Sequence, residues 1–447
     1  MKKYDIIAIG GGNTGLTVVA KAAAAGKRTA LIDRGPIGGL CSLNGCNPKK
    51  VLVRSTEVLE EIRQAGKFGI EVEDFRVDWS RVIDRKETFT KPVAPSTEAW
   101  LKDAKIDYLR GAPKFRSEKT LEINGETLEF ESVVVATGSV PRPLSFSGAD
   151  LVQTSDDILA MRKIPPRLVI IGAGVVAFEF GQVFARLGSK VTMLVHEDRA
   201  LGGNEEELVD ALVEHSRGLG IEFIYRAGVR SVAKENDALL LVVKTEEGLQ
   251  HLLGDFVLNA AGRIPSIKEL DLEKANIAYD GRGVKTDEFL RSATNPRAWA
   301  GGDAHGRMQL SPIASYEGRV IARNLVEGAK DRADYRVIPR AIYTIPAFAS
   351  VGLTEKQARE QGYEVEVHSS DMTSWKVPAI LGAELARAKV IEDAKAGQIL
   401  GAHLLTPTAA DQIHTFAMAM LGNIPAKVLR DFVYAYPTFT SATGYAV

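Results

Sequence analysis

The chain has few cysteines, almost no net charge and no long hydrophobic run, and each absence excludes a class of protein. Two cysteines in 447 residues are too few for a fold held together by disulfides. A formal net charge of −1 argues against nucleic acid and anionic membranes as partners. No stretch reaches the ~18 consecutive apolar residues of a membrane-spanning helix. We therefore expect a globular cytoplasmic protein, and its length predicts about three domains.

Glycines follow the first apolar run at the spacing of a dinucleotide-binding turn. Tyr4–Ile9 is too short for a signal peptide and predicts a buried strand. Gly10, Gly12 and Gly15 come next and precede an Ala-rich predicted helix, so the backbone can approach a pyrophosphate at the positive end of that helix. The following apolar run ends at Asp33, where a carboxylate can accept hydrogen bonds from a ribose. The segment predicts a bound dinucleotide.

The same pattern returns in the middle of the chain. The run Arg167–Ile171 predicts a strand, and a second glycine turn and a second predicted helix follow it. This turn contains Gly172, Gly174 and Ala177. Two dinucleotide sites in one chain predict a two-electron relay, in which hydride passes from a nicotinamide cofactor to a bound redox cofactor.

The second site differs from the first at the position of the acid. Where the first site has Asp33, the second has Val195, so it lacks a carboxylate for the ribose 2′-hydroxyl. His196 and Arg199 follow, and cations without the acid favour a 2′-phosphate, hence NADPH over NADH. Glu197 keeps NADH open, because its carboxylate offers a displaced ribose acceptor.

The two cysteines, Cys41 and Cys46, lie five positions apart. Thiols at this spacing can close a disulfide only where the turn between them is distorted, and Asn44-Gly45 provides a flexible link. A helix is predicted over Val51–Ala65, directly after Lys50. A helix start and a lysine lower the pKa of a nearby thiol from its usual ~8.5 and make it nucleophilic. The pair therefore predicts a redox-active dithiol.

The segment Gly38–Lys50 resembles the signature GG-x-C-x4-C-x-P-x-K of the flavoprotein pyridine nucleotide-disulfide oxidoreductases, such as glutathione reductase, dihydrolipoamide dehydrogenase and mercuric reductase. Five further segments are similar to family motifs and occur in the family's order along nearly the whole chain. They begin at Val133, Ala260, Ala300, Gln309 and Ala349. The resemblance implies FAD in the first site and NAD(P)H in the second. Further residues that it assigns to cofactor binding are Gly39, Lys50, Ala136, Thr137, Gly138, Glu179, Gly262, Arg263, Gly302, Asp303, Ser311 and Pro312.

The resemblance also implies residue roles, a fold and an assembly. Cys41 is then the interchange thiol that attacks the substrate, and Cys46 is the thiol nearest the flavin. Lys50 matches the lysine beside flavin N5, and Glu179 matches its ion-pair partner. The implied fold is α/β, with two Rossmann-like domains for FAD and NAD(P) and a C-terminal α+β dimerisation domain, assembled as a homodimer. The expected bounds are 1–148 and 267–333 for the FAD domain, 149–266 for the NAD(P)H domain and 334–447 for the interface domain.

The C-terminal segment departs from the family pattern. Disulfide reductases of the family carry His-Pro-Thr there, followed by a Glu, as the general acid/base. This chain has Tyr436-Pro437-Thr438, and Ser441 or a neighbour stands in place of the Glu. A phenol has a pKa of about 10, against about 6.5 for imidazole, so Tyr436 is suited to donate a proton but not to accept one. Tyr436 is either a catalytic donor or an aromatic that packs at the dimer interface.

The expected reaction is reduction of a small-molecule or protein disulfide by NADPH, through FAD and the Cys41–Cys46 pair. Loss of the His would matter less for a quinone or a soft metal ion, which keeps those acceptors open. Soluble transhydrogenases also carry Tyr-Pro-Thr but typically lack the first cysteine. A flavin redox sensor with little turnover is a further alternative. His, Cys and carboxylate residues show no metal-site spacing, so no resident metal is predicted.

Overall fold

The computed structural model describes residues 1–328 and 330–447, and it divides into two compact units. Each unit combines segments that are distant in sequence, because the chain leaves the unit and later returns. The first unit contains Met1–Val51, Arg81–Pro143 and Gly262–Ala333, and the second contains Leu52–Ser80, Leu144–Ala261 and Asp334–Val447.

The first unit is built on a seven-stranded sheet in the order β3-β2-β1-β6-β5-β4, with β18 beside β6. β1 pairs in parallel with both β2 and β6, and its two faces are buried. Ile6 and Ala8 enter the core on one face while Ile7 and Ile9 enter the core on the other, which explains the uninterrupted apolar run. The strands of this unit are β1 (Lys2–Ile9), β2 (Thr29–Asp33), β3 (Asp107–Arg110), β4 (Lys114–Ser117), β5 (Thr120–Ile123), β6 (Glu126–Val135), β7 (Ser139–Pro141), β15 (Arg263–Pro265), β16 (Tyr279–Asp280), β17 (Gly283–Val284) and β18 (Ala298–Ala300).

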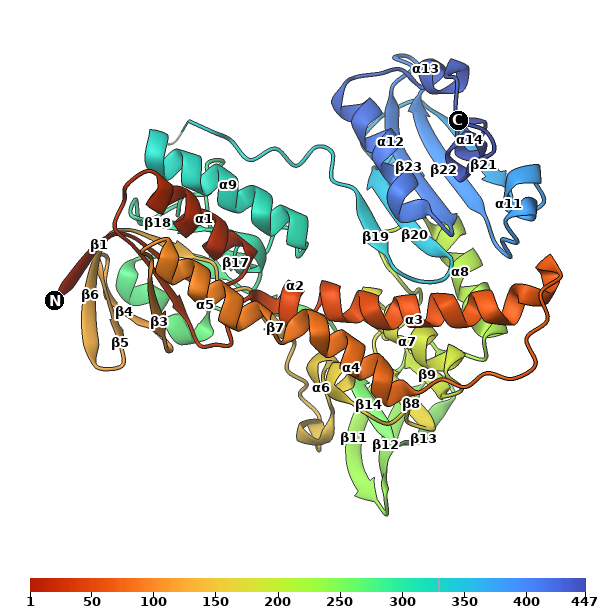
Figure 1. Cartoon of the computed structure of the whole chain (residues 1–447), viewed down its shortest axis with the longest axis horizontal. Coiled ribbons are helices and arrows are strands. Elements are labelled where there is room, and N and C mark those ends of the chain that lie inside the picture. The colour runs from red at the N-terminus through yellow and green to blue at the C-terminus, as the bar shows by residue number, and fades with distance from the viewer. Residues whose placement is uncertain (329) are drawn as a thin grey trace. The chain divides into compact units, whose positions relative to one another are not determined.

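Helices α1 (Asn13–Ala24) and α9 (Ser311–Glu327) lie side by side against one face of this sheet (Figure 1). Their contact is close enough that a Cβ on Gly318 would lie 3.0 Å from the Thr14 carbonyl oxygen. The first residues of the two helices are thereby brought together. The unit also contains α2 (Gly39–Leu43), α5 (Val93–Asp103), η3 (Lys268–Leu270), η4 (Leu272–Ala275) and η5 (Gly302–Ala304).

Helix α3 (Cys46–Gln64) begins earlier than the helix predicted from Val51, and it continues into the second unit. Helix α4 (Trp79–Thr90) begins in the second unit and continues into the first. Pro48 lies in the first turn of α3, where its missing N–H removes no intrahelical hydrogen bond. Cys46 is consequently the first residue of the helix, and not a residue of the loop before it.

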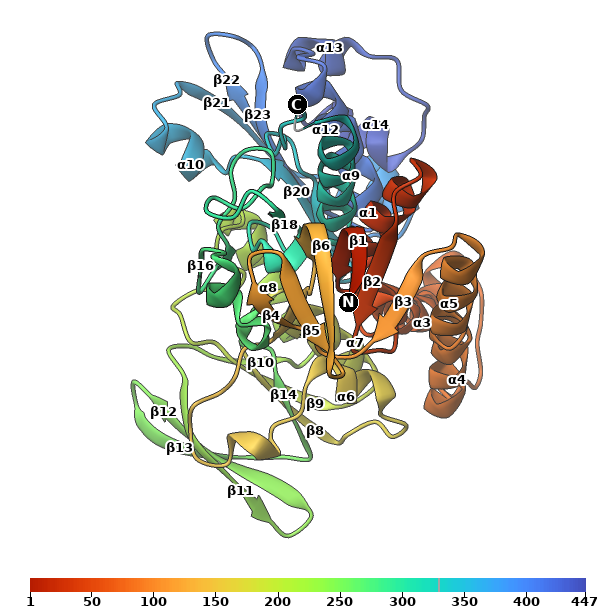
Figure 2. The same ribbon diagram turned by 90° about the vertical axis from the view of Figure 1, so that its left-hand side faces the viewer.

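The second unit contains a parallel four-stranded sheet in the order β10-β9-β8-β14 and a separate antiparallel sheet of β11, β12 and β13 (Figure 2). The strands are β8 (Arg167–Ile171), β9 (Lys190–Leu194), β10 (Glu222–Ile224), β11 (Gly228–Glu235), β12 (Ala238–Thr245), β13 (Gly248–Gly254) and β14 (Phe256–Asn259). The helices are η1 (Ala65–Phe68), η2 (Ala149–Leu151), α6 (Ser155–Ala160), α7 (Val175–Arg186) and α8 (Glu206–Gly218). Strand β8, a turn and helix α7 repeat the order of β1, a turn and α1.

The C-terminal part of this unit is an antiparallel sheet in the order β19-β20-β23-β22-β21, with α12 packed on its apolar face. The strands are β19 (Arg340–Ile342), β20 (Ala347–Gly352), β21 (Val365–Asp371), β22 (Arg387–Asp393) and β23 (Ile399–Thr406). The helices are α10 (Glu355–Glu360), α11 (Lys376–Ile380), α12 (Ala409–Leu421), α13 (Ala426–Asp431) and α14 (Phe439–Gly444). Within residues 1–328 and 330–447, no helix combines the length and apolar character needed to cross a membrane.

The two Rossmann-like sheets and the C-terminal α+β segment confirm the predicted fold class. The predicted bounds 1–148, 149–266, 267–333 and 334–447 stay a prediction, because the compact units place the middle and C-terminal segments together.

Candidate functional site

The turn after β1 has a backbone that only glycine permits at two positions. Gly10 has φ 114°, and a Cβ there would lie 2.1 Å from the Ala136 carbonyl oxygen. A Cβ on Gly15 would lie 1.9 Å from the Gly10 carbonyl oxygen. Gly12 is the N-cap residue of α1, so the positive end of a 12-residue helix faces the turn. Gly10, Gly12 and Gly15, with Ala136 behind them, therefore leave the backbone open to the close approach of a pyrophosphate.

Asp33 and Thr137 both line a small pocket beside this turn. Asp33 accepts hydrogen bonds from the Gly11 N–H and the Gly35 N–H, both at 2.6 Å. The Thr137 hydroxyl is buried and has no hydrogen-bond partner within the described residues. The pocket has a volume of about 180 Å³ and is lined by Ile9, Gly10, Ile32, Asp33, Arg34, Gly111, Pro113, Thr137, Ser266 and Leu270. A glycine cradle with an acid and an unsatisfied hydroxyl fits the nucleotide half of FAD.

A second group of predicted residues gathers where β7 pairs with β15. Gly138 and Gly262 both have positive φ at the strand ends. Arg263 donates to the Ser139 hydroxyl at 2.9 Å and to its carbonyl at 2.7 Å, and Ser139 donates to Asp303 at 2.6 Å. Burial raises the pKa of Asp303, and the hydrogen bond from Ser139 opposes that rise. Asp303 is therefore held in one orientation by two residues of the same unit.

Glu317 belongs to this group but was not singled out from the sequence. It is 1% exposed on α9, and it accepts from the Gly302 N–H at 2.6 Å. Its other carboxylate oxygen lies 3.2 Å from His305 Nδ1. The sequence does offer a signal for Glu317, which is a carboxylate on the apolar face of a helix. Such a group is rarely buried without partners. Glu317 fixes the backbone beside Asp303.

The dithiol segment is joined to the first nucleotide turn. The Gly38 N–H donates to the Gly11 carbonyl at 3.1 Å. A Cβ on Gly39, which has φ 70°, would lie 2.5 Å from the Gly12 Cα. Cys41 lies in the short helix α2 that follows, and Gly45 permits the tight turn from α2 into α3. The segment that leads into the dithiol is thus in contact with the dinucleotide turn.

Cys41 and Cys46 are two thiols that change each other's pKa. The pKa of Cys41 falls to about 6, chiefly because Cys46 donates a hydrogen bond to it, with further help from Ser311 and from the charge of Lys49 against the opposing effect of burial. The pKa of Cys46 is raised, first by its hydrogen bond to Cys41. The pair therefore loses one proton readily and the second with difficulty. Cys41 is half-buried and Cys46 is exposed.

Two adjacent lysines stand near the dithiol, and the structure distinguishes them. Lys49 is buried, and its charge lowers the pKa of both thiols. Lys50, the residue matched by the resemblance, is half-buried on the same helix. Both follow Cys46 by about one helical turn, so sequence spacing alone does not choose between them.

Ser311 and Pro312 form the start of α9. The Ser311 hydroxyl helps to lower the pKa of Cys41. Pro312 is exposed in the first helical turn. The predicted helix start therefore influences the ionisation of the dithiol.

The second nucleotide turn repeats the backbone of the first. Gly172 has φ 123°, and a Cβ there would lie 2.3 Å from the Ala260 carbonyl oxygen. Gly174 is the N-cap residue of α7, and Ala177 is fully buried in that helix. Val195 is buried at the end of β9, whereas His196 is exposed.

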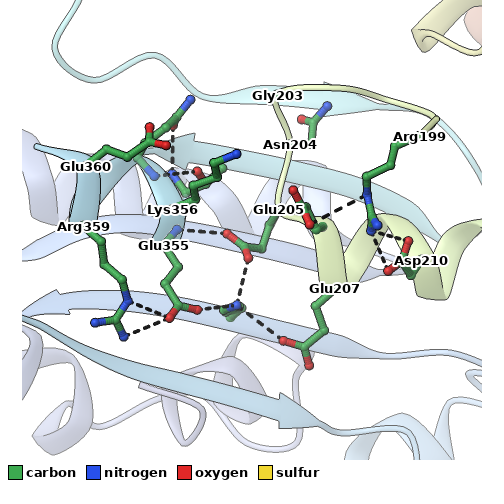
Figure 3. A pocket seen from close by; sticks show the side chains of 14 residues that line it. Arg199, Gly203, Asn204, Glu205, Glu207, Asp210, Glu355, Lys356, Arg359 and Glu360 are labelled. Atoms are coloured by element: carbon green, nitrogen blue, oxygen red, sulfur yellow. Dashed lines mark hydrogen bonds and ion pairs between the residues drawn. The ribbon is translucent and has the colours of Figure 1, made fainter. Parts of the chain in front are cut away.

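Arg199 is already paired with carboxylates. Its guanidinium donates to both carboxylate oxygens of Asp210 at 2.6 Å, and it lies 3.8 Å from Glu206. These residues line a cleft of about 930 Å³ between the start of α8 and the start of α10, shown in Figure 3. Lys389 also lines the cleft and lies 2.8 Å from Glu205 and 2.9 Å from Glu355. The charges lining this cleft largely neutralise one another.

Glu179 and Tyr436 lie in the second unit. Glu179 is 5% exposed on α7 and accepts from the Tyr343 N–H at 2.9 Å. Its predicted ion pair with Lys50, a residue of the first unit, stays a prediction. Tyr436 is 60% exposed and precedes α14. Ser441 belongs to the capping box of α14, where it accepts from the Thr438 N–H at 3.2 Å.

A group of residues with metal-binding atoms was not seen in the sequence because two strands contribute to it. The ligand atoms of Glu366, His368 and Glu392 lie within 4.8 Å of one another. Glu392 accepts from His368 at 3.0 Å and from the Arg430 guanidinium at 2.9 Å. With an arginine on the same oxygen, the group is satisfied as an ion-pair network, and we assign no metal to it.

Comparisons with known proteins cover nearly the whole chain. A family model described as pyridine nucleotide-disulphide oxidoreductase matches residues 4–318, and one described as the dimerisation domain of that family matches residues 338–447. The dihydrolipoyl dehydrogenase of Chlamydia muridarum is 32% identical, over 97% of this chain and 94% of that one. The mercuric reductase of Bacillus cereus is 30% identical, over 99% of this chain and 71% of that one. A solved structure of the HOCl-induced flavoprotein disulfide reductase RclA from Escherichia coli has a TM-score of 0.88 and 27% identity, and covers 98% of both chains.

Two nucleotide turns, a dithiol against one of them and these matches define a class of flavoprotein oxidoreductase. The chain belongs to the pyridine nucleotide-disulfide oxidoreductases, an enzyme family that uses FAD and NAD(P)H. The family membership predicted from the sequence is confirmed.

Proposed function

We propose that the protein is an NADPH-dependent disulfide reductase whose Cys41–Cys46 pair passes electrons to a small-molecule or protein disulfide. The observation that carries the proposal is the coupled dithiol itself, held against the first nucleotide turn, with the pKa of Cys41 at about 6. At neutral pH such a pair exists largely as one thiolate and one thiol, which is the form that attacks a disulfide.

The residues of the first unit would hold FAD. The turn at Gly10, Gly12 and Gly15 would take the pyrophosphate, Asp33 and Thr137 the nucleotide half, and Asp303 the chain that leads to the flavin. When bound, FAD supplies the transfer of an electron pair from the nicotinamide to the Cys41–Cys46 disulfide.

The two thiol steps need no reductant other than the reduced Cys41–Cys46 pair. The Cys41 thiolate attacks one sulfur of the substrate disulfide, which breaks the substrate S–S bond and releases one substrate thiolate. Cys46, on losing its proton, attacks the Cys41 sulfur and releases the second thiolate, which restores the Cys41–Cys46 disulfide. Each released thiolate takes up one proton, and Tyr436 from the second subunit of a homodimer is our proposed donor for this transfer.

The homodimer and the nucleotide preference are parts of the same proposal. Support for a homodimer comes from the family's dimerisation domain at residues 338–447 and from large apolar side chains exposed there, including Met418, Phe432 and Val433. Support for NADPH comes from Val195 in place of an acid and from exposed His196. Arg199 would have to leave Asp210 to reach a 2′-phosphate.

An anaerobic titration with NADPH, and separately with NADH, tests the proposal. We expect a long-wavelength charge-transfer band after the first two electrons, when the single proton of the pair passes from Cys46 to Cys41 and leaves the Cys46 thiolate beside FAD, and we expect loss of the band in Cys46→Ser. Cys41→Ser should retain bound FAD but lose disulfide reduction by about a thousandfold or more, since the nucleophile is removed. Disulfide reduction that survives in Cys41→Ser would overturn the proposal.

Reduction of a soft metal ion is the second candidate. A half-buried thiolate beside a second thiol is a soft ligand pair, and a metal ion has no leaving thiolate to protonate, so replacement of His by Tyr436 matters less. A solved structure of RclA, 26% identical to this chain with a TM-score of 0.90, is a Cu(II) complex. Turnover with Cu(II) but with no disulfide in a panel of substrates would favour this candidate.

A further inference from the structure

One buried carboxylate closes the turn that carries Asp303. This turn is η5, and Glu317 of α9 contacts both of its ends. One Glu317 oxygen accepts from the Gly302 N–H at 2.6 Å, and the other lies 3.2 Å from His305 Nδ1. The opposite side of the His305 ring contacts the Thr286 hydroxyl, with Nε2 and Oγ1 3.2 Å apart. Thr286, His305 and Glu317 therefore form a chain of hydrogen bonds that ends at the turn, within the first unit.

Asp303 has one carboxylate oxygen left for a ligand. Its Oδ2 accepts from the Ser139 hydroxyl at 2.6 Å. Its Oδ1 accepts from no group within residues 1–328 and 330–447. Burial raises the pKa of Asp303 and the charge of Glu317 adds to that rise, so the two carboxylates affect each other. A half-buried oxygen that accepts nothing within the chain is suited to a hydroxyl of a bound cofactor.

We propose that His305 is a positioning residue for FAD, which fixes the Asp303 carboxylate through Glu317 so that Oδ1 meets a hydroxyl of the cofactor. The inference rests on the proposed function, in which Asp303 binds the chain that leads to the flavin. Gly302, directly before Asp303, has φ 65°, a conformation that most side chains avoid and that a fixed hydrogen bond helps to hold. Glu317 accepts that hydrogen bond, and His305 fixes Glu317.

The donor and acceptor capacity of each group sets the direction of the chain. A carboxylate accepts, so the proton between Glu317 and His305 stands on Nδ1. An imidazole with its one proton on Nδ1 has a lone pair on Nε2, to which the Thr286 hydroxyl can donate. The ring is thus held from both sides. Without an N–H at the position of Nδ1, one oxygen of Glu317, which is 1% exposed, would lose this partner.

The backbone around His305 is fixed independently of its side chain. A Cβ on Gly306 would lie 1.5 Å from the Arg282 carbonyl oxygen, and one on Gly283 would lie 2.6 Å from the His305 carbonyl oxygen. Two glycines therefore allow the loop after η5 to pack closely against the hairpin of β16 and β17. Substitutions at position 305 should consequently change the hydrogen bonds of the side chain and leave the path of the loop as it is.

The test measures how fast FAD leaves the FAD-loaded protein. Holoenzyme is diluted, and the rise in flavin fluorescence gives a first-order rate of release. In His305→Ala this rate should rise about tenfold, because the Asp303 carboxylate is no longer held in place for the cofactor. The visible circular dichroism of the FAD that is still bound should change as well, since the cofactor then meets a displaced carboxylate.

Two amides at position 305 separate the hydrogen bond from general polarity. The amide nitrogen of asparagine is bonded to Cγ, as Nδ1 is, whereas that of glutamine lies one bond farther out, as Nε2 does. His305→Asn should therefore release FAD within about threefold of the wild-type rate, and His305→Gln about as fast as His305→Ala. Thr286→Val should have a smaller effect than His305→Ala, because the ring keeps its bond to Glu317. In a Glu317→Gln background, His305→Ala should add little.

His368→Ala is the matched control, in the second unit. His368 Nε2 lies 3.0 Å from Glu392, which is 5% exposed, so this variant also takes an imidazole away from a buried carboxylate. Thermal unfolding should show a comparable loss of stability in His368→Ala and His305→Ala. Release of FAD should be faster only in His305→Ala.

The inference is overturned if His305→Ala releases FAD at the wild-type rate, or if His368→Ala speeds release as much. It is also overturned if His305→Asn releases FAD no more slowly than His305→Gln, and this pair decides if His305→Ala purifies without FAD. Release requires neither NADPH nor a disulfide, so the result stands apart from the turnover of Cys41→Ser, by which the proposed function succeeds or fails.

Discussion

The two nucleotide turns have nearly the same backbone but different surroundings. Gly10 and Gly172 have φ 114° and 123°, and their N–H groups donate to Ile32 and Leu194 at 2.7 and 2.9 Å. The first turn, however, is enclosed, because the dithiol segment and Asp33 both bond to Gly11.

The second turn is open. A Cβ on Gly174 would meet nothing within 4 Å, whereas one on Gly12, its counterpart in the first turn, would lie 3.7 Å from the Gly39 Cα. The second turn has no acid at the position of Asp33, since Val195 stands there. The difference fits our proposal, in which the enclosed turn would retain FAD and the open turn would exchange NADPH.

The largest effect is expected for Gly15→Ala. The new Cβ would displace the Gly10 carbonyl, so we expect loss of bound FAD and destabilisation by about 3 kcal/mol. The second turn already has Ala177 at the position of Gly15, so the comparison is a glycine elsewhere in that turn: Gly174→Ala should stay within about 0.5 kcal/mol and retain FAD. Thermal unfolding and flavin absorbance measure both. Equal damage from the two changes would show that the turns do not differ as described.

A smaller effect is expected for Asp33→Ala. It removes a carboxylate that accepts two backbone N–H groups, at a cost of about 2 kcal/mol, and FAD should bind about thirtyfold more weakly. Asp5→Ala is the control, because Asp5 also accepts a backbone N–H, from Arg28, but lies at the surface. Flavin release is measured by fluorescence, and the Asp5→Ala control should release flavin as the wild type does.

Val195→Glu would make the second turn resemble the first. The added carboxylate should accept from a 2′-hydroxyl and repel a 2′-phosphate, and so shift the preference from NADPH towards NADH by about tenfold. Val195→Gln, similar in size but uncharged, should shift it less. The measurement is the ratio of kcat/KM for the two nucleotides. If neither variant shifts this ratio, the ribose does not bind beside residue 195.

The smallest effect is expected for Arg199→Ala. Since the guanidinium is half-exposed and paired with Asp210, the preference for NADPH should fall by no more than about threefold. Asp210→Asn should raise that preference slightly by releasing the arginine. A much larger loss in Arg199→Ala would show that it leaves Asp210 when the nucleotide binds.

The sequence predicted the features that depend on neighbouring residues. Glycine turns, the apolar runs beside them and the cysteine spacing are local patterns, and each lies in the predicted kind of element. The start of α3 at Cys46 was missed by the helix predicted from Val51, because the pattern of apolar residues begins after the first turn.

Contacts between distant residues were not predictable in the same way. Asn13 and Ser311 meet because α1 and α9 pack together, and nothing in either segment shows that pairing. The ion pair of Arg199 with Asp210 depends on how the loop after β9 folds onto α8. Lys49 and Lys50 are adjacent in sequence, so only the rotation of a helix decides which one is buried.

The capping box of α14 bears on how this chain could acquire the family's proton-transfer pair. Ser441 occupies the third helical position, and a glutamate there satisfies a capping box as well as serine does. The Ser441 side chain is buried, however, so a glutamate there would also need room and a partner for its charge. In evolutionary terms, the resemblance implies that as few as two codons, at Tyr436 and at Ser441 or a neighbour, separate this chain from that pair.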